Sequence, residues 1–134
     1  MSTLAHGIDL VECSRIEDLM QRHGDRFTCR IFTPAEVEYA SSARNRVERL
    51  AGRFAAKEAV LKLIGTGLRG KMAWTDIEVV NDAMGRPCVR LSGEVARIAL
   101  QQGIEQVQIS ITHTAQHAMA SAMALAEPHE DARV

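Results

Sequence analysis

Apolar residues recur at the spacing of an α-helix through the middle of the chain. Leu50, Phe54 and Leu61, together with several alanines, share one side of a helix that we predict over 46–64. Gly65 follows the last apolar position, and glycine is the residue type that most often ends a helix. This segment is the strongest secondary-structure signal in the chain.

Three shorter helices are predicted from their start signals. Ser14 with Glu17 and Thr33 with Glu36 have the spacing of a capping box, in which a hydroxyl and a carboxylate bind the free backbone amides of the first turn. Ser92 can cap a further helix. The predicted helices cover 14–23, 34–43 and 93–102.

Other segments have the apolar character and short length of β-strands. They cover 4–12, 76–80, 86–91 and 106–112. In the first of them the apolar residues fall on both faces, as in a strand that is buried on both sides. The segment 117–126 stays open between helix and strand, because its alanines favour a helix while small and larger residues alternate along it.

Composition narrows the possible functions. The chain has 134 residues and 46% hydrophobic residues, enough for one domain with a packed core but little room for a deep cleft. The formal net charge of -1 argues against a nucleic-acid binder, and no apolar run approaches the ~20 residues that span a membrane. Three separated cysteines fit neither a disulfide framework nor a zinc site, so a cytoplasmic location is expected.

Two carboxylates stand out from apolar neighbours. Asp9 interrupts the first strand, and Glu58 shares a helix side with Phe54 and Leu61. The simpler interpretations are a turn or edge carboxylate for Asp9 and a surface pair between Glu58 and Lys62, one helical turn apart. The alternative is that both carboxylates hold a hard divalent cation, since magnesium prefers one or two carboxylates together with water and substrate phosphates.

Positive charge is concentrated over 44–71, which has eight of the chain's 16 Lys and Arg residues and only two acidic residues. This segment is either a solvated cationic helix or a wall that binds phosphate. The glycine-rich loop 65–70 could let backbone amides approach phosphate, although such a loop is a weak signal by itself. His113 is either a hydrogen-bonded structural residue or a donor to phosphate.

Several stretches together resemble the holo-acyl-carrier-protein synthase family, the short bacterial type of 4′-phosphopantetheinyl transferase. They are GIDLVE at 7–12 followed by Arg15 and Ile16, RIFTPAE at 30–36, RFAAKEA at 53–59 with Lys62, GTG at 65–67, DIEVVND at 76–82, GRP at 85–87 and SITHT at 110–114. The resemblance covers about residues 5–125. Two departures are Thr112, where the family usually has serine, and Cys13, where it commonly has an aliphatic residue.

The resemblance implies a single-domain α+β fold over 1–126, in which a long helix packs on an antiparallel sheet, followed by a polar C-terminal tail over 127–134. It implies that 117–126 is a strand, and that the protein is a homotrimer with sites between subunits. The implied reaction is the magnesium-dependent transfer of the 4′-phosphopantetheine arm of coenzyme A to a serine of apo acyl carrier protein in fatty acid biosynthesis, with adenosine 3′,5′-bisphosphate as the other product.

The resemblance also implies the roles of individual residues. Asp9 and Glu58 would hold magnesium on the pyrophosphate, Lys62 would neutralise the same oxygens, and Glu58 would accept the serine proton. The expected coenzyme A residues are Arg53, Lys62, Gly65, Gly67, Pro87 and His113.

A basic stripe is expected to bind the acidic carrier protein. It consists of Arg15 and Arg22 on one side of the first helix, with Arg26 just beyond; simple surface solvation is the alternative. No nucleic acid or membrane is expected as a partner. The competing functions are the same transfer onto a polyketide or other carrier, a non-catalytic module that binds coenzyme A or the carrier, and a metal-dependent phosphohydrolase, which would need further metal ligands.

Overall fold

The computed structural model describes residues 2–127. The elements in chain order are β1 (Thr3–Glu12), α1 (Cys13–His23), α2 (Asp25–Ile31), α3 (Pro34–Ser41), α4 (Arg46–Ile64), the 3₁₀ helix η1 (Trp74–Asp76), β2 (Ile77–Asn81), β3 (Pro87–Leu91), α5 (Gly93–Gln101), β4 (Gln108–His113) and β5 (His117–Ala126). Of the predicted polar tail, only Glu127 lies within the described residues. Within residues 2–127, no helix is both long enough and apolar enough to cross a membrane.

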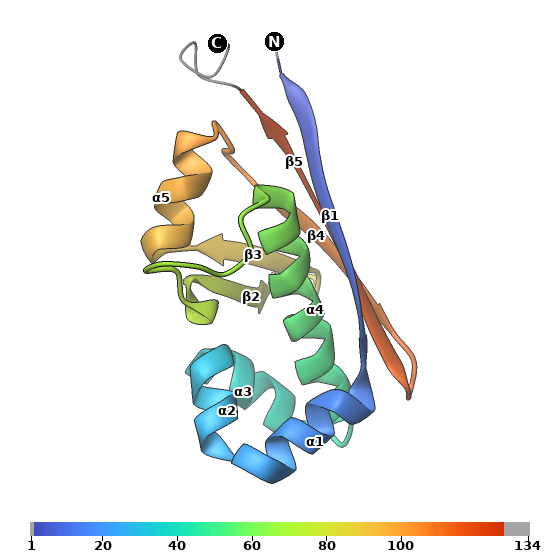
Figure 1. Ribbon diagram of the computed structural model, residues 1–134. Helices are drawn as coiled ribbons and strands as arrows, with labels where there is room; N and C mark the ends of the chain where they lie inside the picture. The colour runs from blue at the N-terminus through green and yellow to red at the C-terminus, as the bar shows by residue number, and fades with distance from the viewer. Residues whose placement is uncertain (1, 128–134) are drawn as a thin grey trace.

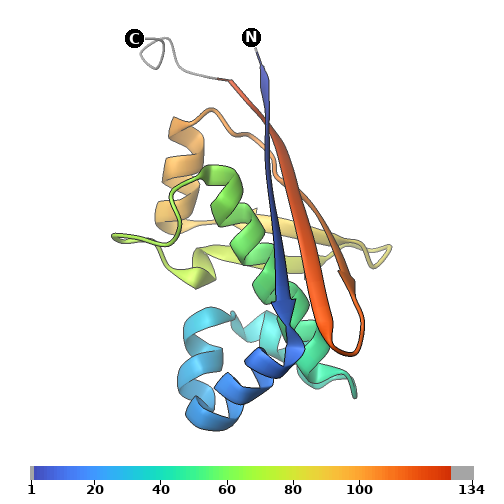
Figure 2. The ribbon, with the colours of Figure 1, turned by 45° about the vertical axis from the view of Figure 1, so that its right-hand side comes forward.

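Helix α4 lies in the middle of the molecule, as Figure 1 shows. An antiparallel sheet with the strand order β1–β5–β4 covers one side of it, and the hairpin β2–β3 with α5 lies on the other side (Figures 1 and 2). The short helices α1–α3 pack near its N-terminal half. The predicted α+β fold, a long helix on an antiparallel sheet, is confirmed.

Small residues let the sheet pack directly on α4. A Cβ at Gly7 would overlap the backbone of Ala59 and lie 2.7 Å from the amide nitrogen of Leu63. On β5, the strand that pairs with β1, the inward residues are the buried alanines 118, 120, 122 and 124. The segment 117–126 is therefore a strand despite its alanine content, because the close packing of sheet on helix outweighs intrinsic helix propensity.

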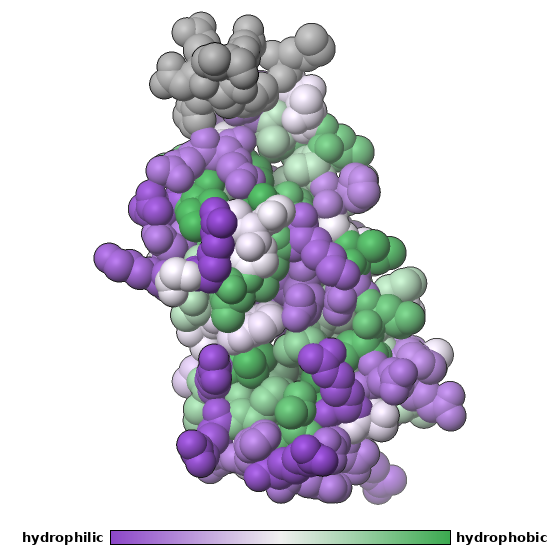
Figure 3. Space-filling view, viewed as in Figure 1, coloured by the Kyte–Doolittle hydropathy of each residue, from purple (hydrophilic) through white to green (hydrophobic). Residues whose placement is uncertain are grey.

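The opposite face of β1 and β5 has large apolar side chains that the single chain leaves exposed. Leu4, Ile8 and Leu10 are 57%, 56% and 63% exposed, and Leu125 on β5 is 63% exposed. Figure 3 shows hydrophobic side chains along this side of the molecule. The prediction that β1 is buried on both faces is wrong for the single chain, since nothing in residues 2–127 covers the outer face.

Of the three predicted capping residues, one caps its helix and two do not. The expected capping box at Ser14 is wrong: α1 begins at Cys13, after Glu12, and has no side-chain cap. At α3 the capping box forms, because Glu36 N donates to Thr33 Oγ1 at 3.3 Å and Thr33 N donates to Glu36 Oε1 at 2.9 Å. Ser92 precedes α5, but its hydroxyl contacts the carbonyl oxygen of Asp76 instead of capping the helix.

The remaining differences are short elements that the sequence pattern does not reveal. Helix α2 lies in a segment for which we predict no element, and η1 takes the place of the start of the strand predicted at 76. Helix α4 has the predicted bounds, and Gly65 ends it in the left-handed region at φ 88°.

Candidate active site

The close packing at Gly7 brings Asp9 to α4. Odd-numbered residues of β1 face the helix, so the Asp9 side chain points inward and is only 17% exposed. Its Oδ1 lies 3.0 Å from Nζ of Lys62, which also donates to the carbonyl oxygen of Ile8 at 3.0 Å. Asp9 therefore lies within the strand and is paired, and the turn interpretation is wrong.

Glu58 lies one helical turn before Lys62 on α4 and is half-buried. Burial raises the pKa of Glu58, and the negative charge of Asp9 raises it further. The positive charges of Lys62 and Arg15 act in the opposite direction, but the pKa of Glu58 stays above its ordinary value. The ion-pair partner of Lys62 is Asp9, so the surface pair between Glu58 and Lys62 is replaced by a three-residue group. We call Asp9, Glu58 and Lys62 the carboxylate cluster.

The carboxylate cluster has the donor set of a magnesium site rather than a zinc site. Within residues 2–127, no group of three or more His, Cys, Asp or Glu residues comes together in a way that could hold a metal ion. Two carboxylates are too few for zinc but suit magnesium, which keeps several waters and takes substrate phosphates. A cation would also relieve the repulsion that raises the pKa of Glu58 beside Asp9. Asp9 and Glu58 therefore fit this ion.

A second group of predicted residues surrounds a small pocket on another face of α4. Arg53, Pro87 and His113 all line it, as the resemblance implies for residues that bind coenzyme A. The pocket has a volume of about 170 Å³. Its other lining residues are Tyr39, Glu48, Arg49, Gly52, Asn81, Gly85 and Ile111. We call this the anion pocket.

Arg53 is the buried cation of the anion pocket, with only 5% of its surface exposed. Its guanidinium lies 3.7 Å from the ring centre of Tyr39, and its Nη2 donates to Asn81 Oδ1 at 3.3 Å. Its Nε is buried and has no hydrogen-bond partner among residues 2–127. Burial lowers the pKa of Arg53. A buried guanidinium with spare donors is suited to a phosphate oxygen.

His113 stands at the end of β4 on the rim of the same pocket. Its Nδ1 lies 3.2 Å from Glu48 Oε2. The sequence gives no sign of this contact, because Glu48 lies on α4 and His113 lies far along the chain at the end of β4. A carboxylate on one ring nitrogen orients a histidine and leaves Nε2 for another partner.

The glycine loop begins where α4 ends. Gly65 and Gly67 have φ values of 88° and 64°, which glycine adopts without strain, and both are exposed. They follow Lys62 closely in the chain. Their predicted contact with coenzyme A stays a prediction.

The predicted docking residues are exposed, but they belong to two helices. Arg22 on α1 pairs with Asp18 at 3.3 Å, and Arg26 lies on α2. Arg15 differs from both, because its guanidinium is 5.6 Å from the Phe54 ring and its charge lowers the pKa of Glu58. Arg15 therefore lies beside the carboxylate cluster.

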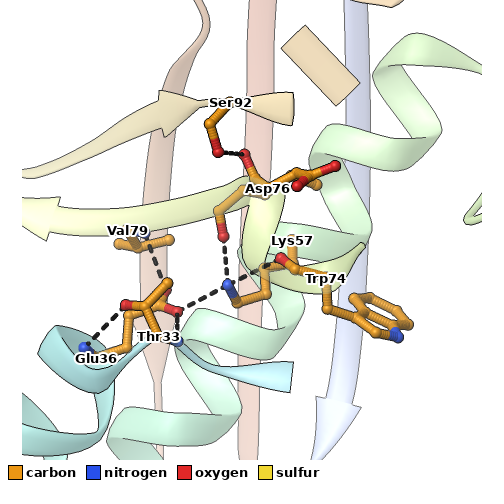
Figure 4. A network of polar contacts seen from close by, with 8 residues as sticks. Thr33, Glu36, Lys57, Trp74, Asp76, Val79 and Ser92 are labelled. Atoms are coloured by element: carbon orange, nitrogen blue, oxygen red, sulfur yellow. Dashed lines mark hydrogen bonds and ion pairs between the residues drawn. The ribbon is translucent and has the colours of Figure 1, made fainter. Parts of the chain in front are cut away.

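Lys57 departs most from the predicted phosphate-binding wall. It is fully buried, and its Nζ lies 2.8 Å from Glu36 Oε1 (Figure 4). It also donates to the carbonyl oxygens of Trp74, at 3.2 Å, and Ile77. Glu36 Oε2 accepts from the amide of Val79 at 2.9 Å. Lys57 is thus a structural cation that joins α4 to α3, η1 and β2.

The carboxylate cluster and the anion pocket lie on opposite sides of α4. A helix turns by about 100° per residue, so Arg53 points about 140° away from Glu58 and about 180° away from Lys62. Their partners agree with this geometry: Arg53 contacts α3 and β2, whereas Lys62 contacts β1. One chain therefore does not bring all the predicted residues into one cleft.

Comparisons with known proteins agree on one family. Residues 5–122 match the family model of the 4′-phosphopantetheinyl transferase superfamily. A holo-[acyl-carrier-protein] synthase of Koribacter versatilis is 50% identical over 118 residues, which cover 88% of this chain and 94% of that protein.

Solved structures give the same result. The crystal structure of holo-[acyl-carrier-protein] synthase from Neisseria meningitidis has a TM-score of 0.82 and 35% identity, covering 90% of this chain and 96% of that one. The Helicobacter pylori enzyme in complex with coenzyme A has a TM-score of 0.78 and 28% identity, covering 89% of this chain and 98% of that one.

Proposed function

The chain belongs to the 4′-phosphopantetheinyl transferase superfamily, and we propose that it transfers the phosphopantetheine arm of coenzyme A to a serine of apo acyl carrier protein, with magnesium, in fatty acid biosynthesis. The holo-[acyl-carrier-protein] synthase relatives support the enzyme class and both substrates. The observation that carries the chemistry is the carboxylate cluster, in which two repelling carboxylates and a lysine meet at a partly exposed surface.

The reaction needs a group that neutralises a pyrophosphate and a group that takes a proton. The serine oxygen bonds to the β-phosphorus while the bond to the bridging oxygen breaks, and adenosine 3′,5′-bisphosphate leaves. Magnesium, held by Asp9 and Glu58, would supply the charge neutralisation on the pyrophosphate. Lys62 is 55% exposed and long enough to turn toward the same oxygens. Glu58, with its raised pKa, is the carboxylate that we assign to accept the serine proton, directly or through a water.

Coenzyme A has a further phosphate outside the pyrophosphate, and the anion pocket suits it. Arg53 and His113 are the cationic and hydrogen-bonding groups there, and Pro87 lies on the wall. The volume of about 170 Å³ is below the roughly 300–1,000 Å³ of complete ligand sites, so the pocket fits only part of the cofactor.

We infer that the complete site forms between copies of the chain in a homotrimer. The opposite placement of the two groups on α4 supports this, because a neighbouring copy can bring its anion pocket to the carboxylate cluster of the first. The exposed apolar face of β1 and β5 supports it too, since contiguous apolar patches on a sheet mark interfaces.

The carrier protein would approach past α1. Arg15 beside Glu58 leads from the carboxylate cluster to the exposed Arg22 and Arg26. A row of cations that ends at the reacting centre suits an acidic partner whose serine must enter the site.

Intact mass spectrometry tests the proposed function. The protein is incubated with coenzyme A, magnesium and a purified apo carrier of either fatty acid or polyketide synthesis. We expect the fatty acid carrier to gain the mass of one phosphopantetheine arm, and the gain to disappear with a chelator. Binding of coenzyme A and carrier without any mass gain would favour the non-catalytic module, and a faster reaction of the polyketide carrier would overturn the assignment to fatty acid biosynthesis.

A further inference from the structure

Two arginines of the anion pocket stack against one tyrosine ring. The guanidinium carbons of Arg53 and Arg49 lie 3.7 Å and 4.3 Å from the ring centre of Tyr39. The two cations are close enough that Arg49 contributes to lowering the pKa of Arg53. An aromatic face attracts a cation, so this ring offsets part of the repulsion between two like charges that it holds together.

Contacts with Tyr39 and its neighbour Asn81 also fix the orientation of the Arg49 and Arg53 side chains. Arg49 Nη1 donates to the backbone carbonyl oxygen of Tyr39 at 2.9 Å. Arg53 is tied through Asn81, whose side chain lies beside the tyrosine. Helix α3, which presents Tyr39, is itself anchored by the buried pair of Glu36 and Lys57. The ring therefore has a rigid support.

The two guanidiniums have no acidic partner of their own. Among residues 2–127, neither Arg49 nor Arg53 forms an ion pair with a carboxylate. The acidic side chain that lines the pocket is Glu48, and it is engaged by His113. Two guanidiniums that form no ion pair with a carboxylate among the described residues, one of them with a buried and unpartnered Nε, suit an anion of charge near -2.

We propose that Tyr39 is a positioning residue, and that Arg49 joins Arg53 as a second anion-binding residue, so that the pocket selects the phosphate monoester of coenzyme A. This rests on the proposed function. A phosphate monoester has a second pKa near 6 and is mostly a dianion at neutral pH, which matches two guanidiniums. The pyrophosphate is left for the carboxylate cluster of a neighbouring copy.

The test compares coenzyme A with 3′-dephospho-coenzyme A as donors. We expect Tyr39→Leu and Arg49→Gln each to raise the KM for coenzyme A about tenfold, and to leave the KM for the dephospho donor and kcat nearly unchanged. Tyr39→Phe keeps the ring face and should stay close to the wild type. Arg90→Gln, an exposed arginine on β3, is the matched control and should change neither KM.

If Tyr39 and Arg49 had only a structural role, their replacement would change the KM for both donors alike. An equal rise of KM with both donors, or no rise with either, would overturn the proposal. Arg49→Gln keeps the proposal testable if Tyr39→Leu does not fold. If the wild-type protein transfers no arm from either donor, the proposed function has failed. If the wild type is active but the variants change the KM for both donors equally, only the proposal about Tyr39 and Arg49 has failed.

Discussion

At the scale of single residues, Asp9 and Glu58 are the pair on which the proposed chemistry depends. Replacing either carboxylate by its amide, in Asp9→Asn or Glu58→Gln, keeps the shape and removes the charge that would hold magnesium. We expect transfer to fall at least about a hundredfold, since metal neutralisation contributes several kcal/mol to the transition state. The mass-spectrometric assay measures it, and circular dichroism checks the fold.

Glu38→Gln is the control for this loss. Glu38 is an exposed carboxylate on α3 that belongs to neither group. Near-normal turnover by either site variant, or an equal loss in Glu38→Gln, would contradict the assignment.

The raised pKa of Glu58 makes a prediction about stability. Because the folded protein holds the Glu58 proton more tightly than the unfolded chain, stability is lost as pH rises from the ordinary value of 4.5 through the raised pKa. With a chelator present, Glu58→Gln should therefore be more thermally stable than the wild type near neutral pH. The difference should vanish below pH 4.5. If the wild type and Glu58→Gln are equally stable near neutral pH, ionisation of Glu58 has no free-energy cost in the folded protein, and the raised pKa is contradicted.

Residues could be predicted where a short motif includes them. Asp9, Glu58 and Lys62 lie in such motifs, and the structure brings them together. The role of Tyr39 could not be found in this way, because it meets Arg53 from α3 and lies in none of these motifs. Arg49 lies one helical turn before Arg53, and Asn81 lies in the motif at 76–82, but the sequence does not show that both meet Arg53 at the tyrosine ring.

At the scale of elements, the buried pair of Glu36 and Lys57 joins the helices to the hairpin. Lys57→Met leaves the Glu36 carboxylate buried without its cation. We expect it to lower the free energy of unfolding by about 3–5 kcal/mol, a large part of the roughly 5–15 kcal/mol of a typical domain. Urea unfolding measures the change.

Two further variants make this test specific. Glu36→Gln combined with Lys57→Met removes both charges and should cost less than the sum of the single changes. Arg97→Met breaks the exposed pair with Glu94 and should lower the free energy of unfolding far less than Lys57→Met does. If the loss of unfolding free energy in the double variant equals the sum of the losses in the two single variants, the buried charges do not stabilise each other.

A separate prediction concerns the docking of the carrier protein on helix α1. Arg22→Glu reverses an exposed charge that lies away from the carboxylate cluster. The KM for carrier protein should rise about tenfold at low salt, less at high salt, while the KM for coenzyme A stays constant. Arg90→Glu on β3 is the control. Equal rises in both KM values would place Arg22 outside a docking surface.

At the scale of elements, the spacing of apolar residues predicted most helices and strands correctly. It failed where tertiary packing determines the secondary structure. Helix α4 agrees with its predicted bounds because its apolar side and final glycine are local signals. The choice of strand for 117–126 depended on the family resemblance, since its alanines pack against α4 from a distant part of the chain. Ser14 does not cap α1 because the helix starts one residue earlier, where the amide of Cys13 bonds to the carbonyl oxygen of Gln116.

At the scale of the whole molecule, the chain separates the carboxylate cluster from the anion pocket and leaves an apolar sheet face exposed. Leu10 and Leu125, both 63% exposed, are the kind of residues that an assembly covers. Both features have one explanation if the site is completed by a neighbouring copy. The expectation that β1 is buried on both faces would then hold in the assembly, although it is wrong for the single chain.

Subunit complementation tests this account most directly. Glu58→Gln disables the carboxylate cluster, and the double change Arg53→Gln with His113→Ala disables the anion pocket. The two variants are co-expressed with different tags, mixed assemblies are purified through both tags, and sedimentation verifies that they are trimers. We predict that each variant alone is inactive at low coenzyme A, whereas mixed assemblies recover about a third of wild-type transfer, because every mixed trimer contains one intact site out of three. Mixed trimers as inactive as their parents would contradict a site shared between subunits.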